Sequence, residues 1–185
     1  DGSDSISRPV RVEVIVTSCR ENAAAGPARA STASAATIAA VQVRATTRKG
    51  SRCRVASCRR GPPYNPRMDS RPIGVFDSGA GGLTVLHECL VTMPHEDFVY
   101  LGDGARLPYG PRPLDEIRRF AGEIAGYLEG QGVKLVVAAC NSATAAALPD
   151  LQRTLSVPVV GVIQPEAHAA VRVTRNRRVG LLATE

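Results

Sequence analysis

The residue with the clearest chemical setting is Cys140, which lies between an apolar run at residues 135–138 and a helical pattern that Asn141 or Ser142 would open. Asn and Ser are favoured N-cap residues. A thiol at a helix N-terminus is stabilised as the thiolate by the positive end of the helix dipole, and the free backbone N–H groups of the first turn can bind a carboxylate. The position therefore suits a base beside an anion site, and it suits equally a buried, inert thiol that packs as a small apolar group.

A second polar segment is the glycine-rich turn that opens with Asp77 and Ser78 and continues to Gly82. It lacks the Gly-Lys-Ser/Thr ending of a phosphate loop and the G-x-G-x-x-G spacing of a dinucleotide loop. A carboxylate at its start would repel phosphate, whereas it could bind an ammonium group or polarise a nearby thiol. The competing interpretation is a plain β–α turn in which Asp and Gly serve the backbone geometry.

The elements that must position these residues follow from the spacing of apolar side chains. Continuous apolar runs predict strands at residues 71–76, 98–101, 135–138, 157–163 and 179–182. Helical spacing predicts helices at residues 83–93, 113–128, 142–155 and 165–173. This alternation indicates an α/β fold with a parallel sheet flanked by helices. Ligands bind at the carboxyl ends of such strands, where Asp77, Asp103, Tyr109 and Cys140 fall, and a small polar ligand is therefore expected.

Residues 1–67 have a different composition from the rest of the chain. They contain 12 Lys and Arg against 4 Asp and Glu, whereas residues 68–185 contain 11 against 13, so the whole positive excess lies in the first segment. A short alternating run at residues 10–16 could form a strand, but the rest of the segment offers little apolar surface to offset its ordering entropy. We expect a disordered basic extension followed by one domain at 68–185. A nucleic-acid-binding arm is the alternative.

Cysteine and histidine positions bear on metals and on the compartment. The five cysteines are odd in number and irregularly spaced, which argues against a disulfide framework. The pair Cys53 and Cys58 has no second Cys or His pair nearby, and none of the three histidines shows metal-ligand spacing, so no metal site is predicted. No membrane span or signal peptide is recognisable. These features predict a reduced, cytoplasmic protein.

Four segments, in order and at similar spacing, resemble the glutamate racemases of the aspartate/glutamate racemase family. They are Ile-Gly-Val-Phe-Asp-Ser-Gly-Ala-Gly-Gly-Leu-Thr-Val at 73–85, Tyr-Leu-Gly-Asp-Gly-Ala-Arg-Leu-Pro-Tyr-Gly-Pro at 100–111, Val-Val-Ala-Ala-Cys-Asn-Ser-Ala-Thr-Ala at 136–145 and Val-Pro-Val-Val-Gly-Val-Ile-Gln-Pro at 157–165. The resemblance covers residues 71–185 and implies the first lobe of a two-lobe racemase fold, with the second lobe beginning near residue 178.

The resemblance implies an enzyme that interconverts L- and D-glutamate without a cofactor and supplies D-glutamate for peptidoglycan. By the matching positions, Cys140 would be one of two catalytic thiols, and Asp77 would assist proton transfer and contact the substrate. The other substrate-binding residues would be Ser78, Tyr109, Gly110, Asn141 and Ser142. Inversion at Cα needs a proton removed from one face and another delivered to the opposite face, which two opposed thiols can do.

The family's second thiol belongs to a Gly-Cys-Thr-His segment that residues 1–185 do not contain. We therefore expect a polypeptide of these residues alone not to racemise glutamate. A racemase of the same superfamily that acts on aspartate or a hydantoin is an alternative, as is a non-catalytic α/β binding fragment with a basic nucleic-acid-binding tail. The partner is expected to be a small-molecule substrate, and neither a membrane nor nucleic acid. The sequence leaves the oligomeric state open, a homodimer included.

Overall fold

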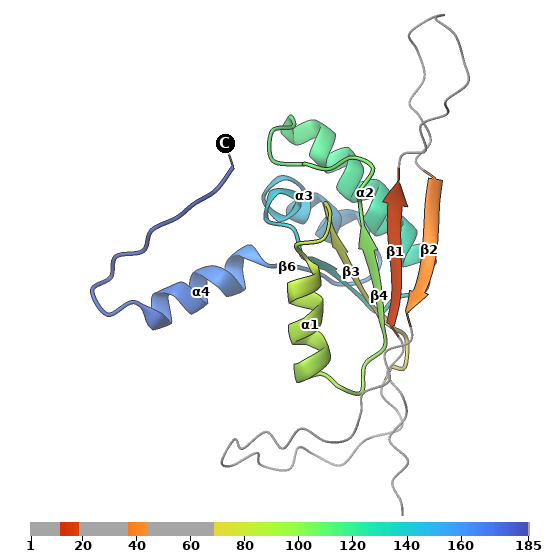
Figure 1. The fold of residues 1–185 in the computed structure, drawn as a ribbon, viewed down its shortest axis with the longest axis horizontal. Helices are drawn as coiled ribbons and strands as arrows, with labels where there is room; N and C mark the ends of the chain where they lie inside the picture. The colour runs from red at the N-terminus through yellow and green to blue at the C-terminus, as the bar shows by residue number, and fades with distance from the viewer. Residues whose placement is uncertain (1–11, 19–36, 44–68, 185) are drawn as a thin grey trace, which may run out of the picture.

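The computed structural model describes residues 12–18, 37–43 and 69–184 (Figure 1). Its strands are β1 (Val12–Ser18), β2 (Thr37–Val43), β3 (Ile73–Asp77), β4 (Phe98–Gly102), β5 (Leu135–Ala138) and β6 (Val159–Gly161). Its helices are α1 (Leu83–Thr92), α2 (Leu114–Gly130), α3 (Asn141–Thr154) and α4 (Ile163–Val173). Strands and helices alternate from β3 onward, as the apolar pattern predicts.

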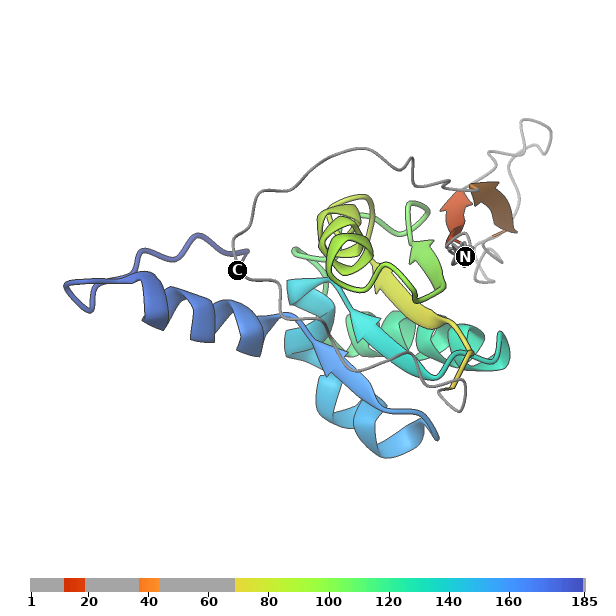
Figure 2. The ribbon, with the colours of Figure 1, turned by 90° about the horizontal axis from the view of Figure 1, so that it is seen from below.

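The described strands form one sheet in the order β2-β1-β4-β3-β5-β6. Every neighbouring pair is parallel except β1 and β2, which are antiparallel. Five parallel strands flanked by helices confirm the predicted α/β class. Figure 2 shows α1 on one side of the sheet and α2 with α3 on the other. The chain leaves β3 toward β4 and leaves β5 toward β6, in opposite directions, so the ends of β3 and β5 form a topological switch point.

Two clusters of buried side chains fill the two sides of the sheet. The larger cluster joins α2 and α3 to the sheet and includes Phe76, Leu101, Phe120 and Val136. The smaller one lies under α1 and includes Val75, Tyr100 and Leu86. Because consecutive strand residues point to opposite faces, Val75 and Phe76 serve different clusters.

Helix α2 shows most clearly why the sequence folds this way. Pro113 stands at its N-cap, and two acidic residues lie in its first turn, where the helix dipole favours negative charge. The predicted apolar face is confirmed for four of its five positions, Ile117, Phe120, Ile124 and Leu128, which are all buried. Leu114 is exposed, because the first residue of the helix extends past the edge of the core. Gly132, just beyond the C-terminus, has φ of +74°, a conformation that favours glycine.

Two details of the predicted elements are wrong. Residues 179–182 were expected to form a fifth parallel strand, but they form no strand, and Leu181 and Leu182 are exposed. An apolar run becomes a strand only when a neighbouring strand accepts its hydrogen bonds, and no described strand pairs with it. The helix predicted at residues 83–93 ends at Thr92, and its residue Leu86 is buried, whereas Leu83 and Met93 are exposed.

The N-terminal segment contributes two strands to this sheet: β1, where the alternating run at residues 10–16 suggests a strand, and β2, where disorder is expected. β1 pairs with β4 in parallel, from Val12 opposite Phe98 to Val16 opposite Gly102. Ile15 is fully buried in the larger cluster. The edge of β4 thus provides hydrogen-bond partners and an apolar site that composition alone does not reveal. The remainder of the predicted extension lies outside the described residues, and the division at residue 67 stays a prediction.

Candidate active site at the ends of β3 and β5

Cys140 is the N-cap of α3, and not merely the residue before the cap. Its backbone is extended, with φ of −112° and ψ of 124°, and the helix begins at Asn141. Its Sγ accepts a hydrogen bond from the Ala143 N–H at 3.5 Å. The expectation that Asn141 or Ser142 would cap the helix is therefore wrong, because the sulfur itself takes the position of the capping acceptor. The thiol is buried and directed at the positive end of the α3 dipole.

Asp77 ends β3 with a buried carboxylate that organises the following turn. Its Oδ2 accepts hydrogen bonds from the N–H groups of Gly79 at 3.2 Å and Gly82 at 2.9 Å. Gly82 is the N-cap residue of α1, so the carboxylate also lies at the positive end of that helix. Glycine is required at 82, because a Cβ there would lie 2.6 Å from the Asp77 Cβ. Oδ2 of Asp77 thus serves the backbone geometry of the β–α turn, as the plain-turn interpretation proposes.

The other carboxylate oxygen of Asp77 is linked to the Cys140 thiol by the Ser78 hydroxyl. The Ser78 hydroxyl lies 3.5 Å from Asp77 Oδ1 and 3.6 Å from Cys140 Sγ. Three side chains predicted from two separate segments therefore meet at the switch point of the sheet. The contacts with sulfur are long and weak, as is usual for a thiol. The arrangement places a carboxylate, a hydroxyl and a thiol in line between the N-termini of two helices.

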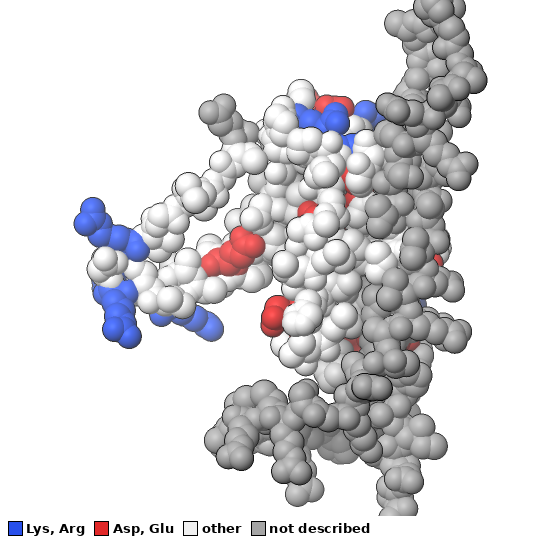
Figure 3. All heavy atoms as spheres, in the orientation of Figure 1, with Lys and Arg blue, Asp and Glu red and all other residues white. Residues whose placement is uncertain are grey.

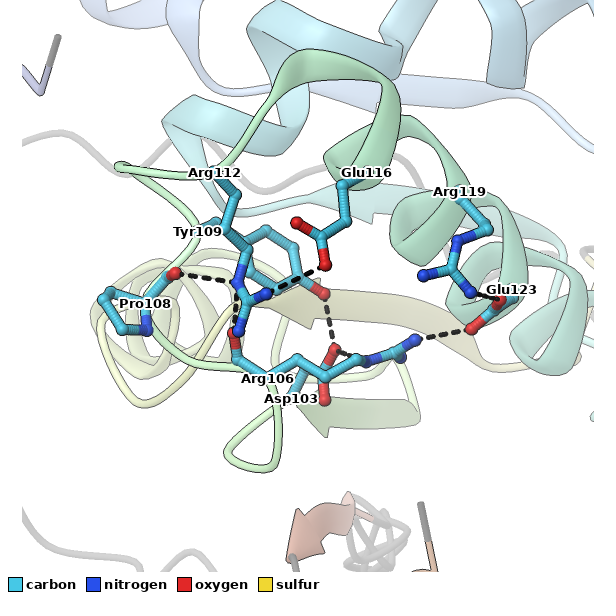
Figure 4. A network of polar contacts seen from close by, with 8 residues as sticks. All are labelled: Asp103, Arg106, Pro108, Tyr109, Arg112, Glu116, Arg119 and Glu123. Atoms are coloured by element: carbon cyan, nitrogen blue, oxygen red, sulfur yellow. Dashed lines mark hydrogen bonds and ion pairs between the residues drawn. The ribbon is translucent and has the colours of Figure 1, made fainter. Parts of the chain in front are cut away.

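Tyr109 is buried in the loop after β4, and its hydroxyl donates to Asp103 Oδ2 at 2.5 Å (Figure 4). Arg106 Nε donates to the same oxygen at 2.5 Å. Burial raises the pKa of Tyr109, and the bond to the Asp103 carboxylate raises it further, so the phenol stays protonated. The Tyr109 hydroxyl is thus bound within the protein. Gly110, which follows it, is half-buried and lies against Thr184.

The loop that carries Tyr109 is attached to α2 through arginines (Figure 4). Arg106 also pairs with Glu123, and its guanidinium lies 4.2 Å from the centre of the Phe120 ring. Arg112 donates to the carbonyls of Arg106 and Pro108 and pairs with Glu116. Sequence reasoning did not find the Arg106–Glu123 pair, because its two residues are 17 positions apart.

The remaining predicted residues divide between the site and the core. Asn141 and Ser142 begin α3 beside the thiol, the first exposed and the second half-buried. Cys89 packs against the cluster under α1, and burial raises its pKa, so it is a poor nucleophile. Sequence reasoning missed Tyr100, whose hydroxyl donates to the Gly79 carbonyl at 3.0 Å. A single Tyr within an apolar strand was the available signal, because a buried phenol normally needs a partner.

Two further features concern only the described ranges. None of their helices is long and apolar enough to cross a membrane. No three or more of their His, Cys, Asp and Glu side chains gather in a group that could hold a metal ion.

Comparison with known proteins agrees with this geometry. The sequence model of the Asp/Glu/Hydantoin racemase family matches residues 83–185. The glutamate racemase of Exiguobacterium sibiricum is 54% identical over 116 residues, which is 63% of this chain and 43% of that protein. A crystal structure of the Thermus thermophilus glutamate racemase with β-chloro-D-alanine is 61% identical, with a TM-score of 0.53 over 55% of this chain and 40% of that one.

A third relative is the Francisella tularensis glutamate racemase, whose crystal structure contains D-glutamate. It is 40% identical, with a TM-score of 0.54, and the match covers 57% of this chain and 41% of that one.

The α/β fold, the site at its switch point and the match to the family model all point to one protein family. The chain belongs to the Asp/Glu/Hydantoin racemase family. It spans about two fifths of the length of the glutamate racemases that it matches.

Proposed function

We propose that the protein is a glutamate racemase that interconverts L- and D-glutamate and supplies the D-isomer for peptidoglycan. The observation that carries the proposal is the line of Asp77, Ser78 and Cys140 between two helix N-termini. It is supported by identities of 54% and 61% to two glutamate racemases, and by the D-glutamate in the Francisella tularensis relative.

In the proposed reaction, the Cys140 thiolate removes the proton from Cα. The electron pair of the broken C–H bond stays on the substrate and is delocalised into its carboxylate, while the proton forms an S–H bond. An acid on the opposite face then delivers a proton to Cα, which inverts the centre. Of the two cysteines that the structure describes, Cys89 is partly buried against the cluster under α1, whereas Cys140 belongs to the cluster on the other side of the sheet, so Cys89 is not that second acid.

The residues around Cys140 suit the remaining requirements. The Ala143 N–H donates to Cys140 Sγ, and the Asn141 and Ser142 N–H groups before it can hold the substrate carboxylate as negative charge develops on it. Ser78, Asn141 and Ser142 would bind its polar groups, and Asp77 would orient Ser78 and favour the substrate ammonium. Gly110 would contribute its backbone, since the adjacent Tyr109 hydroxyl is already bound to Asp103.

We further propose a cytoplasmic location. Free thiols are kept reduced in the cytosol, and both cysteines that the structure describes are free.

The proposal is tested with the full-length protein by following the circular dichroism of L-glutamate, L-aspartate and a chiral hydantoin separately. We expect the glutamate signal to decay to zero and the kcat/KM for glutamate to exceed the other two by at least about a hundredfold, because a site built for one polar group rejects ligands that leave it unpaired. Preferred turnover of aspartate or hydantoin would keep the family and overturn the substrate.

A further inference from the structure

We propose that Tyr100 is a positioning residue of this site. Its hydroxyl holds the Gly79 peptide and thereby keeps Asp77 and Ser78 aligned with Cys140. The inference rests on the proposed function and adds a residue on β4 that contributes no atom to the reaction itself.

The first step is the position of Tyr100. Its ring is buried in the cluster under α1, together with Val75 of β3 and Ala139, which directly follows β5. Its hydroxyl emerges at the turn after β3 and donates to the Gly79 carbonyl at 3.0 Å. Ring packing and hydroxyl bonding are thus separable, because Phe would retain the first and lose only the second.

The second step is that the Gly79 peptide links Tyr100 to the catalytic carboxylate. Its carbonyl accepts from Tyr100, and its own N–H donates to Asp77 Oδ2 at 3.2 Å. The approach is close, since a Cβ on Gly102 would lie 2.5 Å from the Gly79 oxygen. The Asp103 N–H donates to the Asp77 carbonyl at 2.9 Å. β4 and the residue that follows it therefore hold the backbone of the turn at Asp77 and at Gly79.

The third step connects the carboxylate to the thiol. Ser78 lies between Asp77 Oδ1 and Cys140 Sγ, at 3.5 Å and 3.6 Å, and both contacts are at the limit of hydrogen bonding. A small displacement of the turn is enough to break them. Burial raises the pKa of Tyr100, and the nearby charges of Asp77 and Cys140 raise it further, so the phenol keeps the proton that it donates to the Gly79 carbonyl.

The test is the Tyr100→Phe variant, with Tyr127→Phe as the matched control. Tyr127 is half-buried on α2 and packs against the other cluster, so its substitution removes a phenol hydroxyl away from the site. Each cysteine is alkylated with iodoacetamide, and the rate of each is followed by peptide mass spectrometry. This measurement needs no turnover, so it remains informative if the protein proves not to be a glutamate racemase.

We expect alkylation of Cys140 in Tyr100→Phe to speed up by about threefold or more, because a displaced Ser78 hydroxyl no longer accepts the hydrogen bond of the Cys140 thiol and the sulfur becomes free to react. Cys89 should react at the parent rate. In the full-length enzyme kcat should fall by about tenfold, the usual effect of one lost hydrogen bond, with KM within about twofold of the parent. Tyr127→Phe should leave all of these values unchanged.

Two results would overturn the inference. One is parent-like Cys140 alkylation together with parent-like kcat. The other is a lower melting temperature with both cysteines altered in parallel, which would show that the hydroxyl only supports the fold.

Discussion

Helices α2 and α4 are both amphipathic in sequence, yet the structure uses them differently. α2 buries six residues against the sheet and α3, whereas α4 has none buried. Figure 1 shows α4 projecting away from the sheet. Val171 and Val173 on α4 are 72% and 78% exposed. Three arginines follow α4, at positions 175, 177 and 178, and Figure 3 shows positive charge gathered at that far end.

The same part of this domain therefore provides both the packing that stabilises the fold and the side chains of the candidate site. The residues that hold Tyr109 and Asp103 also anchor their loop to α2, and α3 presents Cys140 from the same layer. Apolar spacing identifies a helix face in both α2 and α4, but only neighbouring elements decide whether the face is covered. Substitutions in the packed part should therefore change stability more than matched substitutions elsewhere.

The largest effect on stability is expected for Phe120→Ala. Phe120 is buried, packs on the Tyr109 ring with centroids 5.7 Å apart, and has the Arg106, Arg112 and Arg119 guanidinium groups over its ring. Removing it should cost about 3–5 kcal/mol of unfolding free energy in urea titrations. Val171→Ala on α4 should change stability by less than about 0.5 kcal/mol. Equal losses would show that α4 is packed in solution.

A smaller effect of either sign is expected from two Gly→Ala substitutions. Gly82→Ala should destabilise by about 1–3 kcal/mol, because the new methyl meets the Asp77 Cβ at 2.6 Å. Gly126→Ala should stabilise by about 0.5–1 kcal/mol, because no atom lies within 4 Å of the new Cβ and Ala favours a helix. Thermal melting of both variants measures the difference. A neutral Gly82→Ala would contradict the tight turn at Asp77.

The smallest effect is expected from Glu129 at the end of α2. Hydrogen bonds from the Ser156 hydroxyl and N–H lower its pKa below 4.5. A lowered pKa stabilises the fold above pH 4.5, and the contribution is lost as pH falls through the folded value. Glu129→Gln should therefore melt below the parent at pH 7, with the gap closing in acid. Glu166→Gln on the exposed α4 should show no gap, and a pH-independent gap at Glu129 would contradict the assignment.

The sequence was sufficient for the order of elements from β3 to α4 and for bringing Asp77, Ser78 and Cys140 to one edge. Those features depend on local patterns and on the rule that parallel strands end together. The sequence was insufficient where a cap or a hydrogen bond depends on which side chains the fold brings together. The cap of α3 is a sulfur instead of Asn141 or Ser142, and the Tyr109 hydroxyl is bound to Asp103.

The same reasoning explains the errors outside the site. Residues 179–182 have the composition of a strand but no described neighbour to pair with. The opposite holds for β1, which has a modest pattern but finds the edge of β4 and a buried place for Ile15. The phenol of Tyr100 in an apolar strand indicates that it needs a partner, but local pattern does not identify a partner 21 positions away.

The central claim is that Cys140 is a catalytic base, and it is tested most directly by comparing two cysteine variants of the full-length protein. Racemisation of L-glutamate is followed by circular dichroism, and glutamate binding by calorimetry. Cys140→Ala should lower kcat by at least about a thousandfold while binding persists, since an acid–base group contributes about 10²–10⁴. Cys89→Ala, in the core under α1, should retain the parent kcat. A Cys140→Ala enzyme that racemises glutamate near the parent rate would contradict the account.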